Sequence, residues 1–363
     1  MSSSPSNSSI VAEWKQLNHQ YAEVAEGIKV HFVDVGPRDA TPVVLVHGWP
    51  DFSFGWRHQI GPLSKKYRVI VPDMRGFGSS SVPREVEAYG AKNITSDFAK
   101  LLGKSANTYA RHLDAAPQLI RYFSFASLDF LNIPRAVFVG HDWGGNIIYR
   151  MALYHPDRVL AIVGICTPYY PPSEQYVDLD TMAAAMPGFA YMKFLADTEA
   201  ASKHLEAAPS ALFTAVYRSP QPPAPEGAPK VTFLDILRGI GHSDHPVYTH
   251  RSDLLSEEEL NFYVSEYTAS GFKGACNFYA TRAIDFENER GLPSIIPHQA
   301  LYVGAGRDPV LKPELAAHMP QVVPKLEFAL VKEGGHWLLW DQKDEVTKVL
   351  IDWLDKLDTS AFP

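Results

Sequence analysis

A glycine-flanked aspartate behind an apolar run is the part of this sequence best suited to chemistry. Ala136–Val139 carries no charge, and Gly140-His141-Asp142-Trp143-Gly144-Gly145 separates it from a helical stretch over Asn146–Tyr154. This order predicts a buried strand, a nucleophile elbow and a helix, with Asp142 strained and exposed at the apex. A carboxylate there attacks a polarised saturated carbon and forms an alkyl-enzyme ester. Taken alone, the pattern fits equally an aspartate that only caps a helix.

Hydrolysis of such an ester requires a base that activates water and a carboxylate that orients the base. In this kind of sheet the chain order is nucleophile, acid, histidine. Asp308 follows the apolar run Ala300–Val303, and His336 follows Phe328–Val331. We therefore predict that Asp308 and His336 converge on the elbow, although each alone could be an ordinary turn or loop residue. Glu333 is a competing acid that we expect to face solvent.

The same ester needs an oxyanion hole, because its carbonyl becomes tetrahedral when water attacks. One donor is predicted to be the backbone N–H of Trp143, directly after the nucleophile. The other is predicted to be the backbone N–H of Trp49, in the turn His47-Gly48-Trp49-Pro50 after the apolar run Val43–Val46. Asp51 could join a proton path, but a helix N-cap is the preferred interpretation for it.

The elements that must position these residues alternate between strands and helices. Continuous apolar runs of the kind buried in parallel sheets occur at 43–46, 69–71, 137–139, 159–165, 300–303 and 328–331. Ile28–Phe32 alternates in character and predicts an edge strand. Val346, Val349, Leu350, Trp353 and Leu354 are spaced as one face of a final amphipathic helix. The pattern predicts an α/β fold whose active site lies at the carboxyl ends of the strands.

Two regions interrupt this alternation. About fifty residues, 81–133, separate neighbouring strands, which is more than one crossover helix needs, so we expect an extra helix or a mobile excursion there. From about 168 to 293 the strand pattern vanishes and helical stretches with a proline-rich loop, 219–229, replace it. This second region is predicted to form a lid.

Composition bounds the class of protein. The chain has 363 residues, 46% of them hydrophobic, so it can bury one large core with a satellite domain. Its net charge is -8, from 33 basic and 41 acidic residues, so we expect no basic surface for nucleic acid. Its two cysteines, Cys166 and Cys276, lie far apart, which favours a reducing compartment over a disulfide scaffold. The serine-rich start lacks a signal peptide, and no apolar run is long enough to span a bilayer. We expect a cytoplasmic protein without a membrane span and with a small-molecule partner.

No cofactor or metal motif is found. His242, His245 and His250 cluster in the predicted lid without the spacing of a metal site. Gly76-Phe77-Gly78 lacks the third glycine of a dinucleotide loop, and there is no Walker motif. We therefore expect no bound cofactor and no metal, and the sequence predicts no oligomeric state.

Four segments together resemble epoxide hydrolases of the α/β-hydrolase superfamily, similar to soluble fungal members. They are His47-Gly48-Trp49-Pro50, Pro72-Asp73-Met74-Arg75-Gly76-Phe77-Gly78-Ser79, Gly140–Gly145 and Gly335-His336-Trp337. The resemblance covers roughly residues 20–357. It implies an α/β-hydrolase core over 20–167 and 294–358, a helical lid over 168–293, and a disordered or loosely attached tail over 1–19.

The family uses two lid tyrosines to hydrogen-bond and protonate the alkoxide that epoxide opening generates. Asn277-Phe278-Tyr279 matches the second of them, and Gly188–Phe194 resembles the first, which selects Tyr191. The residue after the first tyrosine is commonly glutamine in the family and is Met192 here. Tyr169, Tyr170 and Tyr217 are the fallback candidates for the first position.

The resemblance thus implies a cofactor-independent hydrolase that converts a small hydrophobic epoxide to a vicinal diol. Asp142 is the predicted nucleophile, Tyr191 and Tyr279 activate the ring oxygen, and His336 with Asp308 hydrolyses the ester. A haloalkane dehalogenase would share the triad but needs N–H donors for halide, of which the Trp143 indole is one. A non-catalytic binding protein that kept the fold is the second alternative.

Overall fold

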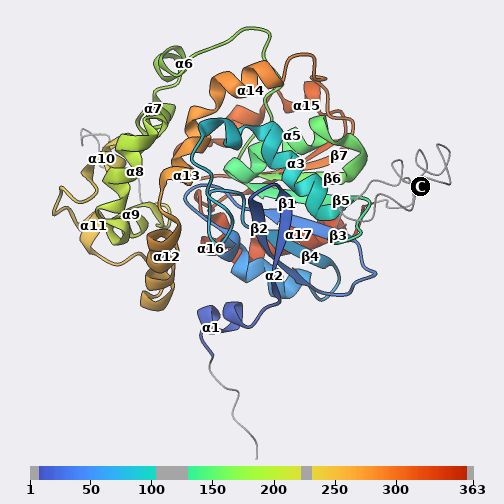
Figure 1. Ribbon diagram of the computed structural model, residues 1–363, viewed down its shortest axis with the longest axis horizontal. Helices are drawn as coiled ribbons and strands as arrows, with labels where there is room; N and C mark the ends of the chain where they lie inside the picture. Colours follow the sequence, from blue (N-terminus) through green and yellow to red (C-terminus); the bar gives the residue numbers. More distant parts are fainter. Residues whose placement is uncertain (1–7, 104–129, 222–230, 358–363) are drawn as a thin grey trace, which may run out of the picture.

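The computed structural model describes residues 8–103, 130–221 and 231–357 (Figure 1). Their strands form one eight-stranded sheet in the order β1-β2-β4-β3-β5-β6-β7-β8. The strands are β1 (His19–Ala25), β2 (Ile28–Val35), β3 (Pro42–Val46), β4 (Arg68–Pro72), β5 (Ala136–His141), β6 (Val159–Ile165), β7 (Gln299–Ala305) and β8 (Leu326–Val331). The β1–β2 and β2–β4 pairs are antiparallel and all others are parallel. The predicted α/β-hydrolase fold, a mostly parallel sheet, is confirmed.

The centre of this sheet is buried on both faces, which explains its uncharged strands. Val43–Val46 and Val137–Val139 are at most 1% exposed. Helices α3 (Ala91–Leu102) and α5 (Trp143–Tyr154) pack together on one face, and α2 (Arg57–Leu63) and α17 (Lys343–Leu354) pack together on the other (Figure 1). The predicted final amphipathic helix is confirmed as α17, which buries Val346, Leu350, Trp353 and Leu354.

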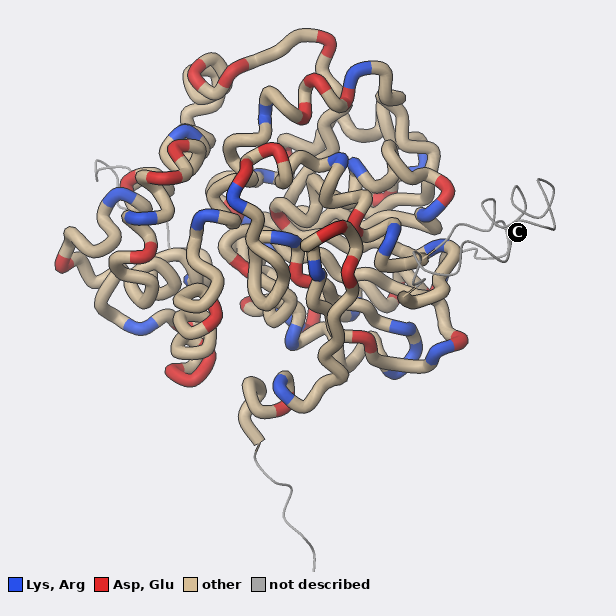
Figure 2. Tube along the Cα trace, viewed as in Figure 1, with Lys and Arg blue, Asp and Glu red and all other residues tan. Residues whose placement is uncertain are grey.

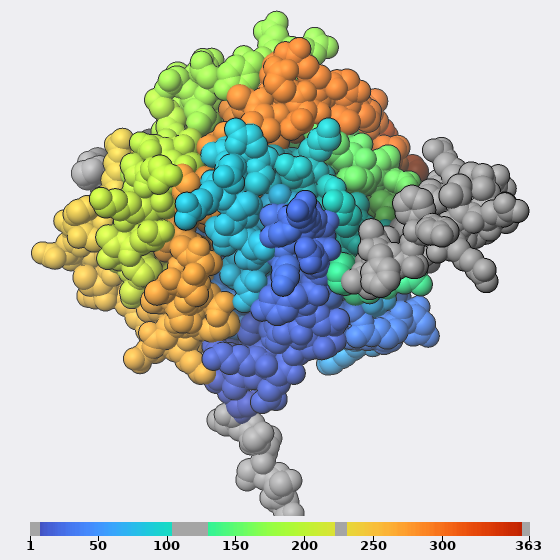
Figure 3. Space-filling view, in the orientation of Figure 1, coloured from blue at the N-terminus to red at the C-terminus, as the bar shows by residue number. Residues whose placement is uncertain are grey.

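The described part of the segment between β6 and β7 contains helices joined by loops and no strand. Its helices are α6 (Leu179–Ala185), α7 (Tyr191–Ala196), α8 (Thr198–Glu206), α9 (Pro209–Val216), α10 (Phe233–Gly239), α11 (Pro246–Thr249), α12 (Glu257–Ser270), α13 (Lys273–Asn277) and α14 (Arg282–Asn288). Most of them gather on one side of the sheet, as the yellow-green and yellow segments of Figures 1 and 3 show. The chain returns to the sheet through α13 and α14 at the mouth of the site described below. Most of the proline-rich loop 219–229 lies outside the described residues.

Further helices lie beside β8 and in the crossover before β5. Helices α15 (Met319–Val322) and α16 (Leu338–Asp341) flank β8. In the long 81–133 segment, α3 supplies the crossover helix after a short 3-10 turn, Val86–Tyr89. The rest of the prediction for that segment falls on 104–129, which lies outside the described residues.

The prediction that Ile28–Phe32 is an edge strand is wrong. β2 pairs with β1 on one side and β4 on the other, so the edge strand is β1. Lys29 in this strand is exposed, but the other two polar residues of β2, His31 and Asp34, are buried with partners. Nδ1 of His31 lies 2.7 Å from Oδ2 of Asp73, and Asp34 pairs with Arg68 at 2.9 Å.

The expectation of a loosely attached tail over 1–19 is wrong from Ile10 onward. Residues Ile10–Lys15 form helix α1, whose N-cap Ser9 accepts from the N–H of Ala12 at 3.1 Å. Val11 and Trp14, three positions apart, are both buried. This helix is therefore attached by an apolar face, and with 6 residues it is too short for a periodic pattern to show.

Charges are distributed as composition suggests. In Figure 2, acidic and basic positions are interspersed along the described trace. No helix among the described residues is both long and apolar enough to cross a bilayer.

Candidate active site

The turn between β5 and α5 has the geometry of a nucleophile elbow. Asp142 adopts φ 52° and ψ -121°, a conformation that side-chain-bearing residues rarely occupy. Close packing around it requires glycine: a Cβ on Gly144 would lie 2.1 Å from the carbonyl oxygen of Val46, and one on Gly140 would lie 2.2 Å from that of Gly144. The strand, the turn and the helix are therefore held together by backbone contact.

The Asp142 carboxylate is held by an amide and does not cap the helix. Asp142 occupies the N-cap position of α5, but its side chain accepts no capping hydrogen bond. Instead, the backbone N–H of Trp49 donates to its Oδ1 at 2.7 Å. Burial raises the pKa of Asp142, while His336 and the N–H groups of Trp49 and Trp143 act in the opposite direction. The two predicted oxyanion donors thus face the carboxylate that they would serve.

The predicted acid and base meet at the carboxyl ends of β7 and β8. Nδ1 of His336 lies 2.7 Å from Oδ2 of Asp308, and its Nε2 lies 3.8 Å from Oδ2 of Asp142. Oδ1 of Asp308 accepts from the N–H groups of Val310 and Leu311 at 2.8 and 2.9 Å. These bonds and His336 lower the pKa of Asp308 even though burial opposes them. An ionised Asp308 therefore fixes the ring with Nδ1 protonated and Nε2 toward the nucleophile.

Glu333 is not brought into this group. Its side chain is 65% exposed and lies 3.7 Å from Arg307. The glycines that follow it let the chain turn, so that the glutamate faces solvent while His336 faces the site. The expectation that Glu333, the competing acid, faces solvent is therefore confirmed.

Tyr191 and Tyr279 stand over Asp142 and line the same cavity. This cavity has a volume of about 640 Å³, within the usual range for small-molecule sites, and Trp143 and Met192 also line it. The two tyrosine rings lie 6.0 Å apart at an interplanar angle of 74°. Burial raises the pKa of both hydroxyls and the Asp142 charge raises it further, so both phenols stay protonated and act as donors.

The three fallback tyrosines are not placed as donors to the site, because two hydroxyls are bonded to backbone carbonyls and the third side chain is exposed. The Tyr169 hydroxyl donates to the carbonyl of Ser294 at 2.9 Å, and the Tyr217 hydroxyl donates to that of Pro50 at 3.0 Å. Tyr170 lines the cavity but is 47% exposed. Of the five tyrosines considered, Tyr191 and Tyr279 are the pair whose rings adjoin each other beside Asp142.

Asp51 is a buried carboxyl whose setting the sequence did not reveal. It does not cap the following 3-10 turn, Ser53–Trp56, whose N-cap is Phe52. Its Oδ1 accepts from the hydroxyl of Tyr263 at 2.7 Å and from the N–H of Phe52 at 2.8 Å. Burial raises the pKa of Asp51 to about 7, against the effect of these bonds. Tyr263 comes from α12, so no local sequence pattern could have paired the two.

A second buried pair, His31 and Asp73, also went unpredicted. Besides His31, the Asp73 carboxylate accepts from the N–H groups of Ser53 at 2.8 Å and Ser79 at 2.9 Å. Burial opposes the charge on each partner, but their mutual attraction raises the pKa of His31 and lowers that of Asp73 to about 2. The pair anchors the turn after β4 and stands apart from the cavity above Asp142.

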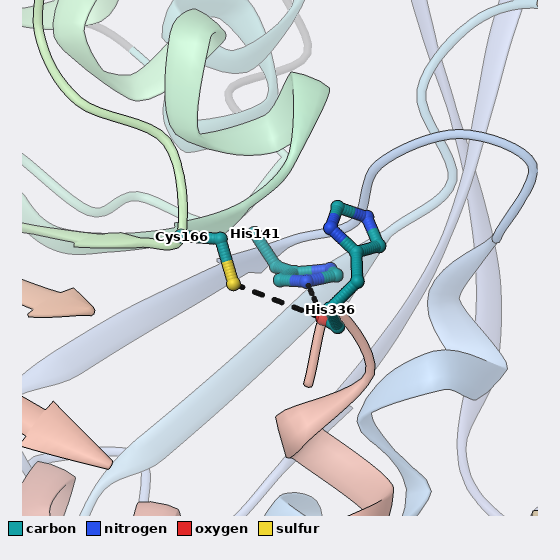
Figure 4. A group of neighbouring side chains, drawn as sticks. All are labelled: His141, Cys166 and His336. Atoms are coloured by element: carbon teal, nitrogen blue, oxygen red, sulfur yellow. Dashed lines mark hydrogen bonds between the residues drawn. The ribbon is translucent and has the colours of Figure 1, made fainter. Parts of the chain in front are cut away.

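Within the described chain, one group of side chains comes close enough together to suggest a metal site: His141, Cys166 and His336 (Figure 4). One potential ligand atom of each residue already has a hydrogen-bond partner, whereas Nδ1 of His141 is buried without one. Nε2 of His141 and Sγ of Cys166 both donate to the backbone carbonyl of His336, and Nδ1 of His336 bonds to Asp308. The arrangement supports the triad and leaves no set of free ligands, and the absence of a metal cofactor stays a prediction.

Comparison with known proteins places this geometry in a family. Residues 41–343 match the family described as alpha/beta hydrolase fold, and residues 8–55 match the one described as epoxide hydrolase N terminus. The chain belongs to the α/β-hydrolase fold family. The second match includes the whole of α1, which agrees with the packing of that helix.

The relatives are named as epoxide hydrolases. Bifunctional epoxide hydrolase 2 of Mus musculus is 32% identical over 340 residues, which are 93% of this chain and 55% of that protein. The chain thus spans about half the length of this relative. Epoxide hydrolase srdG of Neurospora crassa is 28% identical and the alignment covers 94% of this chain and 96% of the relative. The predicted resemblance to epoxide hydrolases, fungal ones included, is confirmed.

The solved structures agree with this result. Epoxide Hydrolase A from Mycobacterium thermoresistibile is 26% identical, with a TM-score of 0.75, over 94% of this chain and 99% of that one. Potato epoxide hydrolase I is 22% identical with a TM-score of 0.72, and at that identity the likeness concerns the fold alone.

Proposed function

We propose that the protein is an epoxide hydrolase that forms a covalent ester on Asp142. The observation that carries the proposal is the placement of two phenol donors, Tyr191 and Tyr279, over a carboxylate at a nucleophile elbow, in one cavity. A carboxylate nucleophile suits attack on saturated carbon, and a phenol suits the alkoxide that leaves when an epoxide opens. The names of the relatives support the same reaction.

In the first step, Oδ2 of Asp142 forms a bond to an epoxide carbon and the carbon–oxygen bond of the ring breaks. The ring oxygen takes the electron pair and receives a proton from Tyr191 or Tyr279. Oδ1 stays on the N–H of Trp49 and becomes the carbonyl oxygen of the ester. The nucleophilic oxygen is thus distinguished from the one that the amide holds.

In the second step, His336 takes a proton from water, and the water oxygen attacks the ester carbonyl carbon. The N–H groups of Trp49 and Trp143 stabilise the tetrahedral oxyanion. Collapse breaks the bond between the carbonyl carbon and Oδ2, and the diol oxygen takes the proton that His336 holds. The second proton of the water passes to the tyrosinate left by the first step, so the phenol is restored and the Asp142 carboxylate is regenerated with one oxygen from water. His336 has the right neighbour for this role because Asp308 fixes its tautomer.

The substrate is inferred to be hydrophobic. Most of the residues that line the cavity above Asp142 are apolar, among them Met182, Phe189 and Phe278. Exposed apolar residues also stand among its lining, namely Tyr170, Tyr176, Val177 and Met186. An apolar substituent would therefore remain in apolar surroundings along the cavity, while the epoxide meets the polar groups at its inner end.

We also infer the division into a core, 20–167 and 294–358, and a lid, 168–293. It is supported by the helices between β6 and β7, with no strand among the described residues there, and by the position of Tyr191 and Tyr279, which come from that segment. A reducing, cytoplasmic setting is supported by Cys166 and Cys276, which are both free and buried.

The test of this proposal is a single turnover in heavy-oxygen water, with enzyme in excess over styrene oxide. The label is expected in the Asp142 carboxylate, found by mass spectrometry of the peptide, and the first diol should be unlabelled. Label in the first diol alone would overturn the covalent mechanism. Bromoalkanes tested in parallel address dehalogenation, and halide release without epoxide turnover would replace the proposed activity.

A further inference from the structure

The backbone carbonyl of His336 accepts hydrogen bonds from two buried side chains. Nε2 of His141 lies 2.7 Å from this oxygen, and Sγ of Cys166 lies 3.7 Å from it (Figure 4). A carbonyl oxygen can only accept, so Nε2 of His141 carries a proton. Burial lowers the pKa of His141 to about 3, which keeps the imidazole neutral. The two donors reach the same atom from the ends of two neighbouring strands, β5 and β6.

Both donors are held in place at some energetic cost. Nδ1 of His141 is buried without a hydrogen-bond partner. Cys166 has φ 64°, in the left-handed region that residues with a Cβ avoid. That conformation is fixed from β7, because the N–H of Cys166 donates to the carbonyl of Val303 at 2.9 Å and its carbonyl accepts from the Tyr302 hydroxyl at 3.1 Å. Neither side chain is among the residues that line the cavity above Asp142, so neither is placed to contact a substrate.

The segment that carries His336 needs such support. It runs from β8 to α16 through Gly334 and Gly335, which restrict the backbone least. The ring is fixed at Nδ1 by Asp308, but its approach to Asp142 also depends on the orientation of the His336 peptide. A base must be held within about 0.5 Å of its working position by the hydrogen bonds around it. Two donors on the adjoining carbonyl orient that peptide.

We propose that His141 and Cys166 are positioning residues that form a main-chain clamp on His336 and so set the distance between its Nε2 and Asp142. The inference rests on the proposed function, in which His336 acts as base on the alkyl-enzyme ester. The two steps of that reaction respond differently. The alkylation of Asp142 uses the tyrosines, whereas hydrolysis of the ester uses His336, so a loosened clamp slows hydrolysis and spares alkylation.

This asymmetry gives a kinetic signature. When hydrolysis alone slows, the ester accumulates and kcat and KM fall together, while kcat/KM, which is set by the steps up to alkylation, stays unchanged. A general loss of folded protein lowers kcat alone and leaves KM unchanged. A distorted elbow lowers kcat/KM.

The experiment compares donor-removing and donor-keeping variants in the full chain. His141→Met and Cys166→Ala each remove a donor, while His141→Gln and Cys166→Ser each keep one. Rapid-quench single turnovers with styrene oxide measure alkylation and ester hydrolysis separately. His141→Met should slow hydrolysis about 10- to 100-fold, as expected for a small displacement of a catalytic group, with alkylation within about twofold of wild type. His141→Gln and Cys166→Ser should recover most of the rate.

His298 offers a matched control. It is a buried histidine whose Nε2 also donates to a backbone carbonyl, that of Pro156 at 3.0 Å, and whose Nδ1 also lacks a partner. It differs in position, because it precedes β7 and so stands at the amino end of that strand, whereas the site lies at the carboxyl ends. His298→Met should reduce thermal stability without changing the ratio of the two steps.

The outcomes separate the two proposals. Equal slowing of alkylation and hydrolysis in His141→Met, or a His141→Gln variant as slow as His141→Met, would overturn the clamp. If His141→Met does not fold, the comparison of Cys166→Ala with Cys166→Ser decides in the same way. Wild-type enzyme that turns over no epoxide would instead overturn the proposed function.

Discussion

Nε2 of His336 lies 3.8 Å from Oδ2 of Asp142, while Nδ1 of the same ring lies 2.7 Å from Oδ2 of Asp308. One imidazole therefore bridges two carboxylates. Burial disfavours its charge, but the two carboxylates outweigh burial and raise the pKa of His336 to about 9. In the proposed reaction, ester formation removes the charge of Asp142. The base then loses its proton more readily at the stage where a neutral imidazole is needed.

The first prediction concerns His336 itself. His336→Gln should still be alkylated by styrene oxide but should not hydrolyse the ester, because no base faces Asp142. Steady-state turnover should fall by about 10³-fold or more. Intact-protein mass spectrometry should show one added substrate mass, located on the Asp142 peptide. Asp142→Asn is the control and should show no adduct. An adduct on any residue other than Asp142 would contradict the assignment of the nucleophile.

The second prediction concerns the phenol donors. Tyr191→Phe and Tyr279→Phe should each slow alkylation by about 10²-fold, and the double variant by about 10⁴-fold, because an unprotonated alkoxide is a poor leaving group. Single-turnover quenching measures this step directly. Tyr170→Phe, which removes a phenol from the same cavity farther from Asp142, should alkylate at the wild-type rate. Single and double variants that alkylate normally would remove the observation on which the proposed function depends.

The central architecture could be predicted from sequence because it obeys local rules. Uncharged runs such as Val43–Val46 become strands buried on both faces, and a glycine-rich turn after such a run becomes an elbow. Residues that directly follow parallel strands, as Asp308 and His336 do, meet at one edge of the sheet. Local spacing was therefore enough to bring the acid and the base together.

The errors and omissions involve partners that are distant in sequence. His31 in β2 suggested an exposed edge, but it is buried against Asp73, which follows β4. Asp34, farther along β2, is likewise buried against Arg68 in β4. Asp51 was interpreted as a helix N-cap, but its carboxylate accepts a hydrogen bond from Tyr263, which lies more than 200 residues later in the sequence. The carbonyl of His336 offered no signal at all, because backbone acceptors are identical in every sequence.

The third prediction is the pH dependence of ester hydrolysis. In the ester, Asp142 carries no charge, so the pKa of His336 should fall below its free-enzyme value of about 9. The rate constant for ester hydrolysis, measured by rapid quench from pH 5 to 10, should rise with pH and level off with an inflection below 9. Asp308→Asn removes the other carboxylate charge and should lower the inflection further. An inflection at 9 or above would show that Asp142 does not influence the base.

The fourth prediction is that ionisation of Asp51 lowers the free energy of unfolding as pH rises. Its pKa is about 7 in the folded chain because of burial, compared with about 4 for an unperturbed aspartate. Between these values the folded state binds more protons than the unfolded state, so this group makes stability fall as pH rises from about 4 to 7. The decrease is at most about 1.4 kcal/mol per pH unit, and it should level off above pH 7.

Asp51→Asn cannot ionise, so it resembles the protonated carboxyl at every pH. The difference in the free energy of unfolding between this variant and wild type, measured by urea denaturation at pH 5, 6, 7 and 8, should therefore move in favour of the variant as pH rises, with the change complete near pH 8. Tyr263→Phe removes the hydroxyl that stabilises the Asp51 carboxylate. It should raise the pKa of Asp51 further and shift the same decline to higher pH. A difference that is constant with pH, or one that moves in favour of wild type, would show that Asp51 is charged in the folded protein at neutral pH and that a positive partner compensates its burial.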